Sequence, residues 1–370
     1  MMKKILIAPD SFKGTFSALN ICRILEEEIK TASPEAEVTA VPVADGGEGT
    51  AEAFLYAFGG EKINCCVKSP LGRSIDAYYV RLKDGTVVIE SALASGLTLE
   101  KERDALCASS YGTGQLVKYA LDSGARRIFI GIGGSAMTDG GTGFLAALGA
   151  DFYDEGGNKL TPSGEMLERI NSIDLSAFDR RVNGAEITVL CDVKNPLYGK
   201  NGAAYIFAPQ KGATENEVRL LDRGLKNFAR VSQDLLGKDY SSYEGAGAAG
   251  GLGFALVAYT GAVLKSGIDL VLDFAGFEEK AQKADIIITG EGKMDSQSLM
   301  GKVPFGVASR CKGKRVVAVV GVNEATEEEC EKMGLSLVIE TNPLHLPFEE
   351  IKPLAEKMLR EAVKSLIFNI

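Results

Sequence analysis

Short apolar segments alternate with helix-compatible segments at both ends of this 370-residue chain. The apolar segments have the length of strands, and helical periodicity follows several of them. Strands are predicted at residues 3–9, 37–43, 284–290, 315–321 and 335–341. Helices are predicted at about residues 18–30, 50–58 and 348–367. Because strands and helices alternate, these segments predict a parallel sheet of the α/β class.

The middle of the chain has a different pattern. Three short apolar runs, at residues 62–68, 76–82 and 86–90, are joined by SPLGR and KDG and predict an antiparallel meander. The simplest architecture has two dissimilar α/β domains, because an inserted domain leaves the chain ends together and creates a cleft. A doubly wound, mostly parallel, Rossmann-like domain is predicted from residues 1–60 and 275–370, and the inserted α/β domain from residues 61–274.

Charge and histidine content exclude several classes of function. The net charge is −9 and no basic stripe occurs, which argues against nucleic acid as a partner. The single histidine, His345, makes a Ser-His-Asp triad or a histidine-rich zinc site untenable. Acid–base chemistry would therefore depend on Asp, Glu, Lys, Tyr or Cys.

The chain also lacks the signals of a membrane or secreted protein. No apolar stretch reaches membrane-spanning length, and the opening MMKKILIAPD has neither a long apolar run nor a cleavage site of small residues. Its seven cysteines are scattered without a CxxC pair, which favours a reduced cytoplasmic protein. Nothing in the sequence indicates an oligomeric state.

Acidic and glycine-rich loops follow the predicted strands. The stretch ADGGEGT at residues 44–50 is by itself compatible with a simple turn, since Asp-Gly is common in turns. Similar clusters follow two other strands, however, and the carboxyl ends of parallel strands share one edge of a sheet. The clusters contain Asp10, Ser11 and Lys13, then Asp45 and Glu48, then Glu291, Lys293 and Asp295. We therefore expect a ligand site at this edge.

Two further loops follow strands of the inserted region. GIGGSAMTDGG (131–141) follows RRIFI, and CDVKNPL (191–197) follows EITVL. Glycine lets a backbone approach a ligand and direct N–H groups at phosphate oxygens, while carboxylates can hold a divalent cation. The phosphate-binding candidates are Gly46, Gly47, Gly133, Gly134 and Ser135. The alternative for the 131–141 loop is close packing of a helix against a strand.

A dinucleotide-binding enzyme is the second hypothesis. No Walker-type phosphate loop occurs, but GIGGSA satisfies G-x-G-x-x-A after a predicted strand, and Asp151 lies near the offset for a ribose contact. An NAD(P)-dependent oxidoreductase of a small hydroxy acid would use this loop. The acids at the other strand ends have no role in hydride transfer. A non-catalytic binding module is the third hypothesis.

Eight motifs of the chain resemble the successive motifs of the bacterial glycerate kinase family, class I, of the glycerate 2-kinase type. They are APDSFKG, VADGGEGT, GIGGSAMTDGG, CDVKNPL, FAPQKGA, GAGAAGGLG, SGIDLV and TGEGKMDSQSLMGKVP. The resemblance extends in order from Lys4 to about Gly321. It implies phosphorylation of D-glycerate by ATP with Mg²⁺, usually to 2-phosphoglycerate, in a cleft between two dissimilar α/β domains.

The kinase hypothesis assigns expected roles to the strand-end residues. Lys13 is expected to hold the γ-phosphate or the glycerate carboxylate, and Asp192 to act as the base for the glycerate hydroxyl. Asp192 could instead be a structural carboxylate paired with a lysine or a backbone N–H. The expected metal ligands, or residues that relay contact to a phosphate, are Asp45, Glu291 and Asp295, for which helix capping is the alternative. The remaining substrate- or phosphate-binding candidates are Asp10, Ser11 and Lys293.

The chain departs from the family pattern at a few positions. Met137 and Thr138 stand where members commonly have Thr and Asn. Tyr111 and Gln115 replace an Arg and a Glu of another frequent motif. The loss of the arginine removes a possible bidentate partner for a carboxylate or phosphate, which places any anchoring role of position 111 in doubt.

Overall fold

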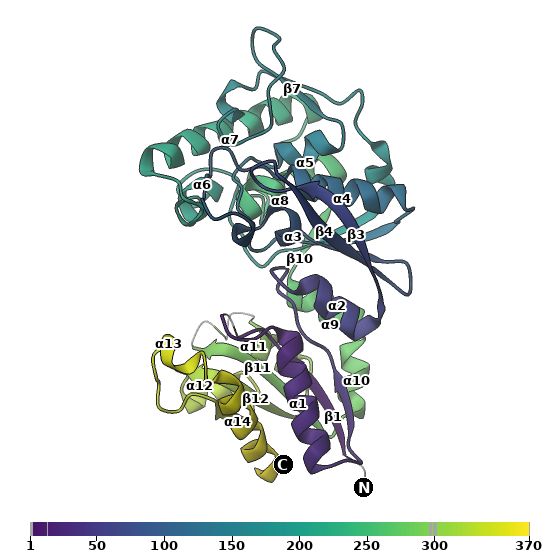
Figure 1. Ribbon diagram of the computed structural model, residues 1–370, viewed down its shortest axis with the longest axis vertical. Helices are drawn as coiled ribbons and strands as arrows, with labels where there is room; N and C mark the ends of the chain where they lie inside the picture. The colour runs from purple at the N-terminus through teal and green to yellow at the C-terminus, as the bar shows by residue number, and fades with distance from the viewer. Residues whose placement is uncertain (1–2, 13, 296–297, 299–301, 370) are drawn as a thin grey trace. The chain divides into compact units, whose positions relative to one another are not determined.

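The computed structural model describes residues 3–12, 14–295, 298 and 302–369 (Figure 1). Contacts divide the chain into two compact units. The terminal unit comprises Met1–Ala44, Glu52–Phe58 and Gly267–Ile370, and the inserted unit comprises Asp45–Ala51 and Gly59–Ser266. The domain ranges expected from the sequence remain a prediction, since compact units need not coincide with folding domains.

The terminal unit contains a five-stranded sheet whose strands pair only in parallel. Its strands are β1 (Lys4–Pro9), β2 (Glu37–Ala40), β11 (Ile286–Met294), β12 (Arg315–Asn323) and β13 (Leu337–Glu340). They lie in the order β13-β12-β11-β1-β2. The parallel sheet predicted from both ends of the chain is thus confirmed.

The strand order of this sheet reverses between β1 and β11. From β1 the chain proceeds to β2 on one side, whereas β11, β12 and β13 extend in sequence on the other side. In an open parallel sheet, a crevice outside the carboxyl ends forms at such a reversal and is the usual place for a ligand. The topology therefore directs attention to the ends of β1 and β11.

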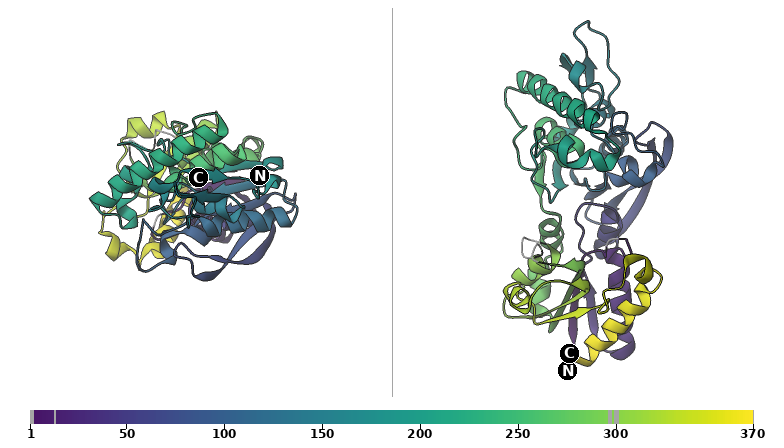
Figure 2. Two further views of the ribbon diagram at one scale, coloured as in Figure 1. Left: turned by 90° about the horizontal axis from the view of Figure 1, so that it is seen from above. Right: turned by 90° about the vertical axis from the view of Figure 1, so that its left-hand side faces the viewer.

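Helices pack on the terminal sheet through alternating strand residues. Helix α1 begins after the N-cap Ser17, whose hydroxyl accepts the Asn20 N–H, and buries Leu25 against Ile7 and Ile288. Helix α14 lies along α1 and contributes to the same core (Figure 2). The helices of this unit are α1 (Ala18–Ala32), α9 (Gly267–Phe274), α10 (Phe277–Lys283), α11 (Val303–Ser309), α12 (Glu327–Lys332), α13 (Phe348–Ile351) and α14 (Ala355–Asn369).

The last predicted helix is two helices in the structure. The sequence predicts one helix over residues 348–367, but α13 ends at Ile351 and α14 begins at Ala355. Pro353 lies between them, and proline both lacks a backbone N–H and clashes with the preceding turn of a helix.

The inserted unit contains a six-stranded mixed sheet in the order β10-β9-β6-β5-β4-β3. β3, β4 and β5 pair antiparallel and form the predicted meander, whereas β5, β6, β9 and β10 pair in parallel. These strands are β3 (Gly60–Lys68), β4 (Ser74–Leu82), β5 (Val87–Glu90), β6 (Arg127–Gly131), β9 (Glu186–Leu190) and β10 (Val263–Lys265). A separate two-stranded sheet consists of β7 (Asp151–Tyr153) and β8 (Ser172–Asp174). The predicted fold class, a parallel-sheet α/β domain from both chain ends with a second, dissimilar α/β domain inserted into it, is confirmed.

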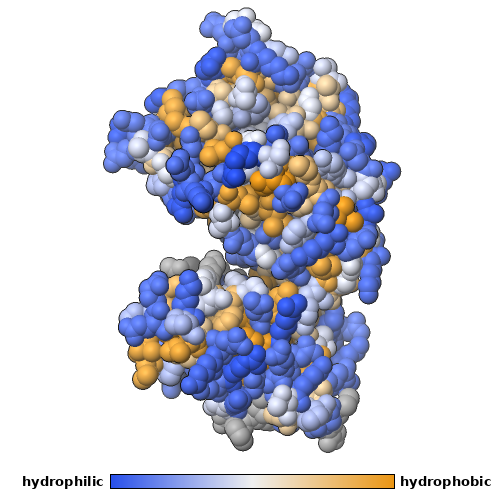
Figure 3. All heavy atoms as spheres, viewed as in Figure 1, coloured by the Kyte–Doolittle hydropathy of each residue, from blue (hydrophilic) through white to orange (hydrophobic). Residues whose placement is uncertain are grey.

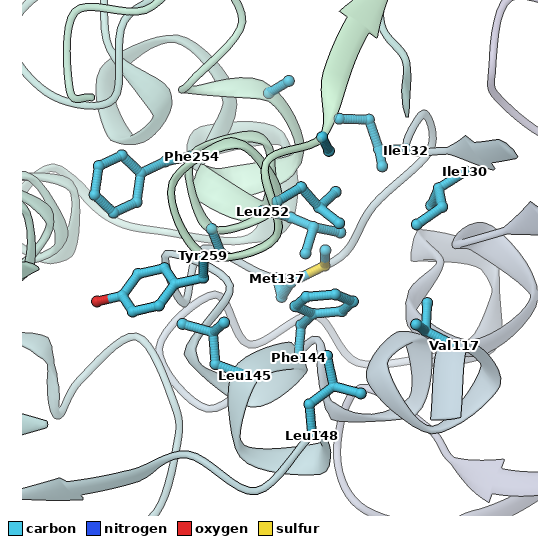
Figure 4. Close-up of a cluster of buried hydrophobic side chains, with 14 of the residues drawn as sticks. Val117, Ile130, Ile132, Met137, Phe144, Leu145, Leu148, Leu252, Phe254 and Tyr259 are labelled. Carbon is cyan, nitrogen blue, oxygen red and sulfur yellow. The ribbon is translucent and has the colours of Figure 1, made fainter. Parts of the chain in front are cut away.

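The core of the inserted unit is formed by its sheet and by small-residue helices (Figure 4). Phe144 and Leu252, from two of these helices, are fully buried in it. The helices are α3 (Ala92–Ser95), α4 (Tyr111–Asp122), α5 (Thr142–Ala147), α6 (Ala203–Phe207), α7 (Glu215–Leu236) and α8 (Leu252–Thr260), while α2 (Thr50–Phe58) begins in this unit and ends in the other. Within the described part of the chain, no helix is long and apolar enough to cross a membrane.

Candidate functional site

The carboxyl edge of the terminal sheet carries a pocket of about 440 Å³. Its polar lining includes Asp10 and Ser11 after β1, Glu291 and Lys293 at the end of β11, and Lys302 immediately before α11. Four of these five residues were predicted from the sequence as site residues. Lys13 lies outside the described residues.

β11 is longer than the sequence predicts. Glu291 and Lys293 were expected to follow the strand, but both lie within it and pair with β12. Close strand contact explains the glycines here: a β-carbon on Gly290 would lie 2.1 Å from the Val319 carbonyl oxygen, and one on Gly321 would lie 2.2 Å from that of Gly292. These glycines let two backbones approach each other.

Glu291 is the centre of a small polar cluster. Its side chain is buried, with the residue 4% exposed, and accepts a hydrogen bond from Ser298 Oγ. The ammonium of Lys302 lies 3.7 Å from Glu291 Oε2 and 3.4 Å from Asp295 Oδ1. Burial raises the pKa of Glu291, an effect that the Ser298 hydrogen bond and the Lys302 charge oppose. A cation therefore sits beside two carboxylates at the pocket.

Lys302 was not recognised from the sequence, although it closes the motif that contains Glu291 and Asp295. The available signal was its position directly before Val303-Pro304, where proline at a helix start marks the N-terminus of α11. The predicted Lys293 instead forms an ion pair with Glu324 at 2.8 Å, which raises the pKa of the lysine. Both lysines line the pocket.

Asp10 and Ser11 form the turn that leaves β1. The Asp10 carboxylate accepts the N–H of Ser11 at 2.6 Å, and the Asp10 N–H donates to the Gly290 carbonyl at 2.8 Å. This second bond joins the turn after β1 to Gly290 within β11, at the switch point of the sheet. The half-buried Asp10 is thereby held at the pocket wall.

The opening glycine loop, residues 45–51, belongs to the inserted unit. Asp45 accepts the N–H of Gly47 at 2.9 Å, which is a local turn contact. Glu90, at the end of β5, is only 3% exposed and accepts the N–H groups of Gly49 and Ala51 at 3.1 Å. Glu90 thus satisfies backbone N–H groups at the start of α2. The sequence did not indicate this role, because Glu90 ends an apolar strand.

The glycines of this loop pack against the ends of β6 and β9. A β-carbon on Gly46 would lie 2.6 Å from the Leu190 carbonyl oxygen, and one on Gly133 would lie 2.7 Å from the Gly47 α-carbon. The Gly133 N–H donates to the Gly46 carbonyl at 2.8 Å. The close approach of these two backbones requires glycine at Gly46 and Gly133, and close packing was the alternative predicted for the 131–141 loop. Gly134 is exposed, with a φ of +70°.

The GIGGSA loop does not begin a dinucleotide-binding unit. In that unit the strand before the glycines continues through a helix to a neighbouring parallel strand. Here α5 leads to β7, which pairs antiparallel with β8 outside the main sheet. Asp151, the candidate ribose ligand, forms an ion pair with Lys159 at 2.7 Å. The topology argues against the oxidoreductase hypothesis.

Asp139 is a buried carboxylate that sequence reasoning did not single out. It is 0% exposed and accepts the N–H groups of Gly141, Gly143 and Ser110 and the hydroxyl of Ser110. The carboxylate joins the start of α5 to the start of α4, where backbone donors are otherwise unsatisfied. Asp139 therefore fixes the loop that follows β6.

Lys211 also holds the loop that follows β6. It is 2% exposed, and its ammonium donates to Ser135 Oγ at 3.1 Å and to the Met137 carbonyl. Burial lowers the pKa of Lys211 to about 7, while the charge of Asp139 acts in the opposite direction. Ser135, a predicted phosphate ligand, is thus oriented by a buried lysine.

The low pKa of Lys211 predicts a pH-dependent stability. Between about pH 7 and 10 the Lys211 side chain is protonated in the unfolded chain but neutral in the folded protein. The free energy of unfolding therefore rises with pH in this range. Relative to Lys211→Met, the wild-type protein should gain about 2 kcal/mol between pH 7 and pH 9. Urea denaturation of both proteins at the two pH values measures this gain. Parallel pH profiles would show that Lys211 titrates normally.

Asp192 lies two residues beyond the end of the buried strand β9 and is exposed. Two lysines that could pair with Asp192 have other contacts: Lys194 pairs with Glu244 at 3.6 Å, and Lys211 binds the 135–137 loop. Asp192 and Asp45 belong to the inserted unit, whereas the Glu291 cluster belongs to the terminal unit.

The donor set at the pocket suits a hard divalent cation with few protein ligands. Among the described residues, no group of three or more His, Cys, Asp or Glu is placed to hold a metal. Mg²⁺ commonly uses one or two carboxylates and completes its coordination with water and substrate phosphates. Glu291 and Asp295, which already flank the Lys302 ammonium, match that requirement.

Comparison with known families gives a match along almost the whole chain. The model of the glycerate kinase family matches residues 5–370. The chain belongs to the glycerate kinase family. Both the mixed and the parallel sheet fall within the matched range, so family membership covers both units.

Individual proteins named as glycerate kinases are also similar to this chain. A glycerate kinase of Bacillus subtilis (strain 168) is 43% identical over 99% of this chain and 97% of its own. A glycerate 2-kinase of Escherichia coli (strain K12) is 47% identical over 86% of this chain and 85% of its own. A crystal structure of a Salmonella typhimurium LT2 protein assigned as a glycerate kinase 2 superposes with a TM-score of 0.86, at 40% identity, covering 99% and 97% of the two chains.

The departures from the glycerate kinase family pattern differ in their surroundings. Met137 points into the core beside Phe144 and Leu252 and is 0% exposed (Figure 4). Thr138 is also fully buried, and its hydroxyl makes no hydrogen bond within the described part of the chain. Tyr111, by contrast, is exposed at the start of α4. The substitutions at positions 137 and 138 therefore affect packing.

Proposed function

We propose that this protein transfers the γ-phosphoryl group of ATP to D-glycerate and forms 2-phosphoglycerate. The observation that carries the proposal is the cluster of Glu291, Asp295 and Lys302 beside the pocket at the switch point of the terminal sheet. Phosphoryl transfer needs little covalent chemistry from the protein, and it depends on positioning and on compensation of negative charge. Membership in the glycerate kinase family and the E. coli glycerate 2-kinase relative support the substrate and the product.

Mg²⁺ is the proposed metal, with Glu291 and Asp295 as its carboxylate ligands. When bound, the cation would compensate the charge of the ATP phosphates. The buried Glu291 is held ready by the Ser298 hydroxyl. Lys302 supplies a second positive charge in the same place and is free to move from the carboxylates to a phosphate oxygen, since its side chain is 40% exposed.

The remaining proposed roles belong to residues that bind or deprotonate glycerate. Asp192 is the proposed base for the hydroxyl, and its exposure gives a substrate access to it. Lys13 is the proposed partner of the γ-phosphate or of the glycerate carboxylate. Gly134 and Ser135 are proposed to direct backbone N–H groups at an anion, in a loop held by Lys211.

The setting of the proposed reaction is the reducing cytoplasm. All seven cysteines are free, and burial raises the pKa of Cys22 and Cys311 well above the ordinary value, so these thiols are unreactive. D-glycerate and ATP are the proposed partners.

Purified protein is expected to release ADP from ATP only when D-glycerate and Mg²⁺ are both present. A coupled ADP assay measures this rate. Addition of excess chelator should abolish it, because removal of Mg²⁺ leaves the negative charge of the ATP phosphates uncompensated beside Glu291 and Asp295. Restoration by added Mg²⁺ is the control for enzyme damage. Undiminished ADP release in excess chelator would refute the metal-dependent mechanism.

A further inference from the structure

The pocket of the terminal unit has an apolar part that phosphoryl transfer does not require. Beyond its polar lining, the walls include Phe12 and Phe16 from the loop after β1, and Phe348, Met358 and Leu359 from α13 and α14. This part is continuous with the polar part, because Glu291 and Lys302 line the same pocket. One cavity is therefore lined by both aromatic and charged side chains.

Specific contacts hold the aromatic walls in place. Phe12 and Phe16 exchange two backbone hydrogen bonds, of 2.9 and 3.0 Å, that close a tight loop and present both rings. Gly14 within that loop has a φ of +87°, and a β-carbon there would lie 2.7 Å from the Phe348 ring. The absence of a side chain at position 14 thus lets the Phe348 ring pack against the loop.

The opposite wall is held by a buried amide. Asn342 is 2% exposed, and its side chain both donates to the Leu346 carbonyl at 3.1 Å and accepts the Leu346 N–H at 3.0 Å. These bonds fix the segment between β13 and α13. Phe348 is 43% exposed, and Figure 3 shows hydrophobic side chains at the surface beside α13. An exposed ring held in a fixed place is available to a ligand.

The chemistry of the walls distinguishes between the two substrates of the proposed reaction. Glycerate has a carboxylate and two hydroxyls on three carbons, and burial of such groups against aromatic rings without hydrogen bonds is unfavourable. A flat purine base, by contrast, stacks on aromatic faces. The volume of about 440 Å³ is within the range of small-molecule sites.

We propose that the aromatic residues of this pocket bind the adenine base of ATP, with the phosphates extending toward Lys302 and Glu291. The assignment rests on the proposed kinase function and makes the terminal unit the nucleotide-binding unit. It places the base between the loop after β1 and the α13–α14 segment. Phe348 is then a nucleotide-binding residue.

Titration calorimetry with MgADP, magnesium pyrophosphate and D-glycerate tests the assignment on the full-length protein. Phe348→Ala should weaken MgADP binding roughly tenfold or more, the scale of one lost base–aromatic stack. Pyrophosphate binding should change by less than about twofold, because the charged lining residues Glu291, Lys293 and Lys302 are unchanged. Met358→Trp, which fills the cavity without removing a ring, should weaken MgADP in the same selective way. Leu344→Ala is the matched control, because Leu344 is 78% exposed in the same segment and does not line the pocket.

The outcomes separate this proposal from the kinase proposal. Unchanged MgADP affinity in both variants, with wild-type melting temperatures and normal turnover of D-glycerate, would overturn the pocket assignment alone. Loss of D-glycerate affinity with MgADP affinity retained would also overturn it, since the pocket would then bind the acceptor. A wild-type protein that binds no MgADP and releases no ADP with D-glycerate would overturn both.

Discussion

Asp192→Asn is expected to lower kcat roughly 10²–10⁴-fold, the scale of a lost general base. Asparagine keeps the size of the side chain but cannot accept the hydroxyl proton. Because Asp192 is exposed after β9, the variant should fold and melt like the wild type. Steady-state kinetics with D-glycerate and thermal unfolding measure the two effects separately.

The matched control is Glu244→Gln, which removes an exposed carboxylate that pairs with Lys194 near the same loop. It should leave kcat within about twofold, as surface ion pairs contribute little. If Asp192→Asn kept more than about a tenth of kcat, Asp192 would not be the base. A lower melting temperature with normal turnover of the folded fraction would assign Asp192 a structural role.

Glu291→Gln should lower kcat roughly 10²–10³-fold and raise the Mg²⁺ concentration needed for half-maximal rate, because a preorganised charge at the phosphates is lost. Glutamine retains an oxygen that can accept the Ser298 hydroxyl, so the contact that holds the side chain survives. The rate measured as a function of Mg²⁺ concentration tests both effects.

Glu279→Gln is the control, since Glu279 forms an exposed pair with Lys283 on α10 of the same unit. Its Mg²⁺ dependence should match that of the wild type. A Glu291→Gln enzyme with a reduced kcat but an unchanged Mg²⁺ requirement would remove Glu291 from the metal site and leave it a structural carboxylate.

Local patterns in the sequence were sufficient to predict most of the fold. The apolar runs of β1, β11 and β12 are buried on both faces of a parallel sheet and therefore appear as continuous hydrophobic segments. The SPLGR and KDG turns identified the meander of β3, β4 and β5 for an equally local reason. The family resemblance supplied the kinase hypothesis.

Contacts between residues far apart in the chain could not be predicted from local sequence patterns. Lys211 acquires its low pKa from burial beside Met137, 74 residues earlier in the chain. Glu90 caps a helix start that lies 39 residues before it. The glycine clusters were ambiguous as well: Gly46 and Gly133 are candidate phosphate-binding glycines in the sequence, and in the structure they pack against each other's loops. Composition cannot distinguish these two uses of glycine.

Phosphorus NMR of the reaction product tests the central claim most directly. Transfer from ATP to the 2-hydroxyl of D-glycerate should produce a phosphate ester whose phosphorus couples to a single carbon-bound proton and appears as a doublet, in step with the appearance of ADP. A triplet would indicate the 3-phosphate and contradict the proposed regiochemistry. If ADP formed without any new ester signal, or if no ADP formed, the protein would not be a glycerate kinase.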